Sequence, residues 1–107
     1  MEKMEFKEDG IVTVDKTKKK KIKCCKFKYK PLNRYLMLHA DIENKEYTTL
    51  SDFATGYRLF KIQIKPEKLN KLELKEKLEK YINHFTIEGI QEEIKRLQEL
   101  EELSRKK

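Results

Sequence analysis

Two adjacent cysteines, Cys24 and Cys25, carry the most reactive side chains in this sequence. Neighbouring residues on a strand point to opposite faces, so the two thiols are poorly placed to bond to each other, and the chain has no other cysteine. The pair also lacks the C-x-x-C spacing with which two thiolates converge on zinc. We therefore expect no metal here and interpret the cysteines as small core residues in the reduced cytoplasm.

A second candidate for chemistry is the set His39, Asp41 and Glu43, which would share one face of an extended strand. Imidazole and carboxylate groups at this spacing could bind a divalent ion. The alternative is that the three side chains form the solvated face of a strand whose other face is apolar. We adopt this alternative, and so predict neither a metal nor another cofactor.

Glu43-Asn44-Lys45 resembles the E-x-K half of the PD-(D/E)xK nuclease signature, with Asp15 as a partner acid upstream. The match has little specificity, because the same spacing recurs at residues 5–7, 73–75 and 93–95. The chain also contains no G-x-S-x-G, no glycine-rich phosphate loop and no Cys/His nucleophile arrangement. We predict that the protein is not an enzyme.

The strongest signal is the lysine-rich segment KTKKKKIKCCKFKYK, residues 16–30. The whole chain has a formal net charge of +7, and residues 16–35 contain ten basic residues and no acidic one. The remaining residues are balanced or mildly acidic. Because fields from clustered charges add where those from interspersed charges cancel, this segment should attract an anionic partner.

The same segment has the pattern of a strand. Lys26, Lys28 and Lys30 alternate with Phe27 and Tyr29, which predicts a strand over residues 21–30 that follows a loose loop at 16–20. A bulge at the cysteine doublet would switch the buried face. Lysines that bind phosphates beside aromatic rings that stack on bases are typical of proteins that bind single-stranded or structured RNA. The alternative is that both aromatic side chains point into the core and the lysines only keep an edge strand soluble.

On the first interpretation, a defined set of residues contacts nucleic acid or a nucleoprotein complex. The excess of lysine over arginine indicates contact with the phosphate backbone more than with base edges. The predicted contact residues are Lys18, Lys19, Lys20, Lys21, Lys23, Lys26, Phe27, Lys28, Tyr29, Lys30 and Arg34.

Short strands and then helices must position these residues. Alternating segments at 10–15, 21–30, 34–42, 47–50 and 52–65 predict a small antiparallel sheet, with a hairpin turn at Pro31-Leu32-Asn33 and another turn at Gly56. Pro66 ends the sheet. The fold is therefore predicted to be α+β, with four to five antiparallel strands followed by two C-terminal helices.

Capping residues mark both helices. Asn70 and Glu73 form a capping pair for the first helix, and Thr86 is a cap for the second. The apolar stripe of the first helix comprises Leu74, Leu78, Ile82 and Phe85. The second helix has a narrow seam of Ile90, Ile94, Leu97, Leu100 and Leu103, which could fold back on the sheet or pair with another chain.

Length and composition predict one domain over residues 1–107, with 1–9 loose, 10–65 β-rich and 66–107 helical. The chain is 37% hydrophobic and 42% charged, and no apolar run approaches the roughly 20 residues that span a bilayer. We therefore expect no membrane association.

The chain resembles accessory proteins encoded by phages and mobile elements of AT-rich bacteria. The resemblance lies in its size, its abundance of Lys, Glu and Ile, its small basic sheet, the SDFATGYRLF turn and the charged C-terminal helix. Some of these are anti-CRISPR proteins, which bind a guide-RNA–protein effector and block it. The resemblance implies a nucleoprotein effector as partner and inhibition as function. It assigns no role to any single residue.

Two functions from different classes follow. The first is a non-enzymatic protein that binds nucleic acid or a nucleoprotein effector through its lysine-rich strand. The second is a protein–protein adaptor or homodimer whose interface is the C-terminal helix, at Ile90, Ile94, Leu97, Leu100 and Leu103, with lysines that only supply solubility.

Overall fold

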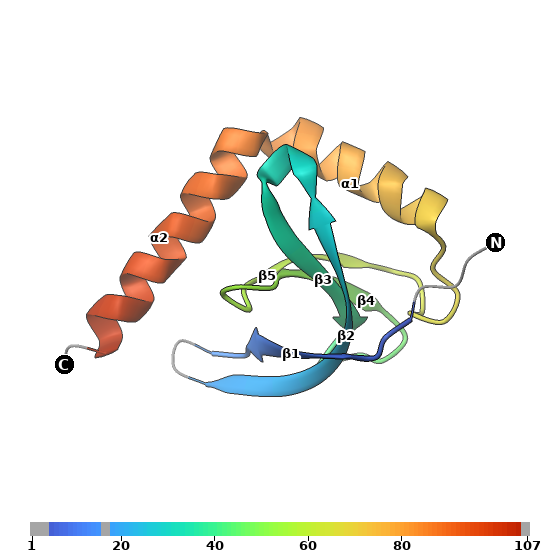
Figure 1. Ribbon diagram of the computed structural model, residues 1–107, viewed down its shortest axis with the longest axis horizontal. Coiled ribbons are helices and arrows are strands. Elements are labelled where there is room, and N and C mark those ends of the chain that lie inside the picture. The colour runs from blue at the N-terminus through green and yellow to red at the C-terminus, as the bar shows by residue number, and fades with distance from the viewer. Residues whose placement is uncertain (1–4, 16–17, 106–107) are drawn as a thin grey trace.

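An antiparallel sheet followed by two helices makes up the protein, as the sequence predicts (Figure 1). The structure, a computed structural model, describes residues 5–15 and 18–105. The strands are β1 (Glu8–Thr13), β2 (Lys19–Tyr29), β3 (Arg34–Ala40), β4 (Thr48–Asp52) and β5 (Arg58–Ile62), and the helices are α1 (Lys71–Phe85) and α2 (Ile87–Arg105). Each strand pairs with its neighbour in sequence, in the order β1-β2-β3-β4-β5.

The hairpin turn between β2 and β3 lies where it was predicted. Residues Lys30–Leu32 form a short 3-10 turn, and Asn33 closes it with a φ of 51° in the left-handed region, which asparagine tolerates. At its other end, β2 is longer than predicted. Lys19 and Lys20 belong to the strand and not to a loop, because they pair with Thr13 and Val12 of β1; Lys16 and Thr17 lie outside the described residues.

Strand β2 changes its pairing partner at the cysteine doublet. Its residues up to Cys24 pair with β1, and those from Cys25 onward pair with β3, with no register shift within either ladder. The doublet is therefore not the predicted bulge. Cys24 is fully buried against Val12 and Met37, whereas Cys25 packs on the main core, so their role as core residues is confirmed.

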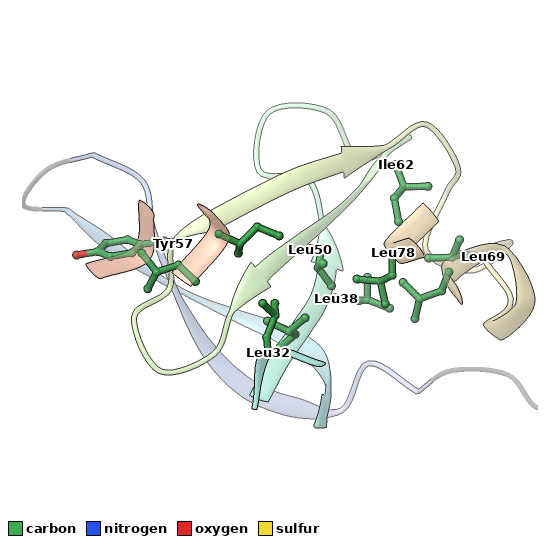
Figure 2. Close-up of a cluster of buried hydrophobic side chains, with 11 residues drawn as sticks. Leu32, Leu38, Leu50, Tyr57, Ile62, Leu69 and Leu78 are labelled. Carbon is green, nitrogen blue, oxygen red and sulfur yellow. The ribbon is translucent and has the colours of Figure 1, made fainter. Parts of the chain in front are cut away.

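The main core lies between the sheet and the helices. Figure 2 shows it as a band of side chains that runs from Tyr57 to Leu69. The band includes Leu36, Leu38, Leu50 and Ile62 from the sheet, Leu74 and Leu78 from α1, and Ile90 and Ile94 from α2. The segment before residue 10, expected to be loose, contributes Phe6 to the edge of this core and the first two residues of β1.

Both predicted helix caps are present. The Asn70 Oδ1 accepts a hydrogen bond from the Glu73 amide at 2.8 Å, and the Thr86 Oγ1 accepts one from the Gly89 amide at 3.1 Å. Thr86 has a φ of 61°, and at this residue the chain turns between α1 and α2, which form an inverted V in Figure 1. Phe85, expected on the buried stripe of α1, is 54% exposed and packs instead against Tyr81.

The seam of α2 is divided between core and surface. Ile90 and Ile94 are buried against the sheet, so the expectation that they meet another chain is wrong. Leu97 is half-buried, and Leu100 and Leu103 are exposed. Only the second half of the seam is available to a partner.

Candidate nucleic-acid interface

Five lysines within and beside β2 are exposed and take part in no ion pair with the residues that the structure describes. They are Lys18, Lys20, Lys21, Lys28 and Lys30. Lys18, Lys20 and Lys21 lie in or beside the part of β2 that pairs with β1, and Lys28 and Lys30 lie in or beside the part that pairs with β3. An unpaired ammonium group keeps its full charge for a phosphate, so these lysines are the ones best able to bind an anion.

Two other lysines of the predicted set already have acidic partners. Lys23 Nζ donates to Asp9 Oδ1 at 2.5 Å, and this hydrogen bond and charge lower the pKa of Asp9. Lys19 Nζ lies 3.1 Å from Glu101 Oε1 of α2, and the other carboxylate oxygen of Glu101 accepts a hydrogen bond from the Tyr57 hydroxyl at 2.6 Å. Glu101 of the acidic helix α2 thus pairs with one of the lysines of β2.

The predicted aromatic contact residues Phe27 and Tyr29 do not lie beside the free lysines. Alternation along β2 places them on the face opposite Lys26 and Lys28, where they pack against the main core. Together with Leu74 of α1, they line a shallow hollow. The prediction that they stack on bases is therefore wrong, and the alternative, that they point inward, is what the structure shows.

Sequence reasoning missed the aromatic residues that do share a face with Lys26 and Lys28. Tyr35 is the cross-strand partner of Lys28 and is 48% exposed. Lys26 Nζ lies 4.6 Å from the ring centroid of Tyr35 and 4.2 Å from that of Phe53, which is cation–π geometry. The position of Tyr35 could have been predicted from the hairpin turn at residues 31–33, because the strand pairing that this turn implies puts Tyr35 opposite Lys28.

Arg34, the arginine of the predicted set, is held by a buried carboxylate. Its Nη2 donates to Asp52 Oδ2 at 2.9 Å and its Nε donates to Oδ1, which makes a two-pronged ion pair. Asp52 is fully buried and also accepts hydrogen bonds from the amide and hydroxyl of Thr55. Arg34 therefore anchors the turn after β4 and its charge is already paired, while its contact with a nucleic acid stays a prediction.

His39, Asp41 and Glu43, the candidate metal set, were expected to form a solvated face. The structure shows that this expectation is wrong. His39 and Asp41 are buried, because the β1–β2 hairpin folds over this face of β3 and packs Val12 and Cys24 on Met37. Glu43 is exposed, with Oε2 3.6 Å from Lys61 Nζ. In the described part of the chain, no three His, Cys, Asp or Glu side chains gather in a way that could hold a metal ion.

Both ring nitrogens of the buried His39 side chain are hydrogen-bonded. Its Nδ1 lies 2.9 Å from the carbonyl oxygen of Ala40, which can only accept, so Nδ1 carries the proton. Its Nε2 lies 2.8 Å from Ser51 Oγ and accepts from that hydroxyl. Burial lowers the pKa of His39 and outweighs the opposing effects of this carbonyl and of Asp41, which favour the charged form.

The free energy of unfolding should therefore decrease as the pH falls below about 6.5. In that window an unfolded histidine binds a proton and the buried His39 does not, so the unfolded state is favoured by up to about 1.4 kcal/mol per pH unit. Urea melts between about pH 7.5 and about pH 5.5 measure the effect. His39→Gln, whose amide supplies one donor and one acceptor without titrating, should show a shallower dependence; equal slopes for the two proteins would contradict the assignment.

Neither described helix is long and apolar enough to cross a membrane. No protein-family model, curated protein or solved structure matches this chain. The functional assignment therefore rests on the chemistry and geometry of its own residues.

Proposed function

We propose that this protein binds nucleic acid, without catalysis, through a basic surface that consists of Lys18, Lys20, Lys28, Lys30 and Tyr35, with Lys21 on the opposite face of β2 as an additional cation. The observation that carries the proposal is the placement of five exposed lysines, none in an ion pair with a residue that the structure describes, along one strand and its flanks. Strand β2 has 11 residues. At about 3.3 Å per residue it follows a path of about 33 Å, long enough to contact several successive phosphates.

Single-stranded or structured RNA is the class of nucleic acid that this surface suits best. The half-exposed Tyr35 ring can stack on an unpaired base, and a base inside a duplex offers no free face for such stacking. The free cations are lysines, which bind phosphates as point charges and do not read base edges with a fixed fork geometry. We therefore expect affinity with little sequence preference.

We extend this proposal to a nucleoprotein complex as the partner in the cell. The support is the resemblance in size and composition to phage-encoded accessory proteins, some of which inhibit CRISPR-type effectors. In that role the basic surface would bind RNA phosphates that the effector leaves exposed. A carboxylate-rich protein surface would attract the same lysines, so the first experiment has to distinguish the two.

Fluorescence anisotropy with labelled single-stranded RNA, single-stranded DNA and duplex DNA across a salt series tests the proposal. If about five lysines bind phosphates, the logarithm of the affinity should fall with the logarithm of salt concentration at a slope of about −3.5 for the single strands. A Tyr35→Ser variant should bind more weakly with an unchanged slope, because stacking releases no counterions. Absence of binding at physiological salt would contradict the proposal.

A further inference from the structure

Two aromatic side chains, Tyr35 and Phe53, are neighbours on the face of the sheet opposite the main core. The Phe53 amide donates a hydrogen bond to the Tyr35 carbonyl oxygen at 3.1 Å. This bond continues the β3–β4 register by one residue pair, so the two side chains point to the same face from Cα atoms about 5.5 Å apart. Tyr35 is 48% exposed and Phe53 is half-buried. We call these two residues the aromatic pair.

The ammonium group of Lys26 lies over both rings of the aromatic pair. Its Nζ is 4.2 Å from the ring centroid of Phe53 and 4.6 Å from that of Tyr35. Lys26 is the cross-strand partner of Met37, so it reaches the rings diagonally from the next row of the sheet. It takes part in no ion pair with a described residue. The two rings are therefore the partners of this charge in the free protein.

Two exposed lysines border the aromatic pair on the side of the hairpin turn. Lys28 is directly opposite Tyr35, and Lys30 follows in the 3-10 turn. A strand whose bases lie on the rings would therefore have two cations within reach of its phosphates.

The acidic residues closest in the sheet leave this side free. Asp52 precedes Phe53 in the chain, but it points to the opposite face, where Arg34 pairs with it. Glu8 is the cross-strand partner of Cys24 and lies beyond Lys26, at the end of the face away from the hairpin turn. The charge beside the aromatic pair thus favours an anionic ligand that enters from the hairpin side.

Rings on neighbouring strands suit the bases of a single strand. Each ring can stack on one unpaired base, and the spacing of about 5.5 Å exceeds the rise of roughly 3.4 Å between stacked nucleotides, so the bound strand has to be extended. A cation–π contact at a partly exposed site is weaker than the stacking of a base on a ring, so a base can displace the Lys26 ammonium.

We propose that the aromatic pair binds two successive unpaired bases of a single-stranded RNA, and that Lys26 covers the rings in the free protein and moves to a phosphate when the bases bind. This inference rests on the proposed function. It adds to it a second stacking residue, Phe53, and a lysine whose position changes on binding.

Anisotropy with two probes of equal length and charge tests the stacking. One is a single-stranded RNA and the other is a phosphodiester oligomer with abasic residues. The wild-type chain should bind the RNA about 100-fold more tightly, or about tenfold for each ring. The double variant Tyr35→Ser/Phe53→Leu should bind both probes equally, whereas Phe85→Leu, which removes an exposed ring on α1, should keep the preference.

The two probes also separate this inference from the proposed function. Equal binding of both probes by the wild-type chain would overturn the role of the aromatic pair and leave the lysines as the binding surface. Binding of neither probe would overturn the proposed function, and this inference with it.

The movement of Lys26 has its own measurement. In the NMR spectrum of the free protein the two rings should shift the Lys26 Hε protons upfield, and RNA should abolish this shift. Lys26→Met should reduce the salt dependence of RNA binding by a slope of about 0.7, because one phosphate contact is lost. An upfield shift that persists in the complex, or an unchanged slope, would contradict the movement of Lys26 to a phosphate.

Discussion

Reversal of the five free lysines to glutamate is expected to raise the Kd for single-stranded RNA by about 100-fold or more. These lysines, Lys18, Lys20, Lys21, Lys28 and Lys30, are in no ion pair with a described residue, so the reversal breaks none; the charge of Lys21 acts only at longer range, where it helps to lower the pKa of Asp9. Each substitution removes one phosphate contact and places a repelling carboxylate where it was. Anisotropy with labelled RNA at fixed salt measures the loss.

The chain offers a control with the same change of net charge. Lys68, Lys75, Lys77, Lys80 and Lys95 are also exposed, but they lie on α1, on α2 and in the segment before α1. Their reversal should lower affinity only modestly, through the long-range field, and circular dichroism should show both variants folded. Equal losses in the two variants would mean that net charge and not the basic surface drives binding, and would overturn the proposed site.

Replacement of Asp52 by alanine is expected to lower the free energy of unfolding by about 3–5 kcal/mol. Asp52 is fully buried and accepts hydrogen bonds from Arg34 and from the amide and hydroxyl of Thr55. Without the carboxylate, a partly buried guanidinium and a buried hydroxyl lose their partner. Urea melts of the two proteins measure the difference.

The same turn also connects distant parts of the sheet. Gly56 has a φ of 76°, and its carbonyl oxygen accepts a hydrogen bond from the Thr13 amide at the end of β1 at 2.7 Å. Loss of Asp52 should therefore loosen the β1 end as well as the turn itself, which amide exchange at Thr13 would report. Asp9→Ala, which removes an exposed partner of Lys23, is the control and should leave the melt almost unchanged. A comparable effect of the two substitutions would contradict the assigned role of Asp52.

Most of the predictions that the structure confirms depend on neighbours in sequence. The hairpin turn at residues 31–33, the cap at Asn70 and the cap at Thr86 are each decided within a few residues, where backbone preference and a nearby side chain act together. The order of strands and then helices follows from the change of apolar period from two to about 3.6.

The predictions that failed concern which face of an element is covered. The faces of β2 and β3 were expected to be one buried and one solvated, yet His39 and Met37 are buried together with Leu36 and Leu38. The reason is that the β1–β2 hairpin folds over the second face of the sheet, where Val12 and Cys24 pack. Periodicity shows which side chains share a face, and it does not show what packs on that face.

The same distinction separates the parts of the candidate site. The sequence by itself determined that ten basic residues lie in one segment and that a strand carries most of them, because charge and alternation are local properties. Only the tertiary structure decided which of them are free. Lys19 pairs with Glu101, and Arg34 pairs with Asp52, across separations that no local pattern reports. The tertiary structure likewise places Phe27 and Tyr29 against the core and leaves Tyr35 exposed opposite Lys28, since long-range packing against the helices sets the buried face of β2.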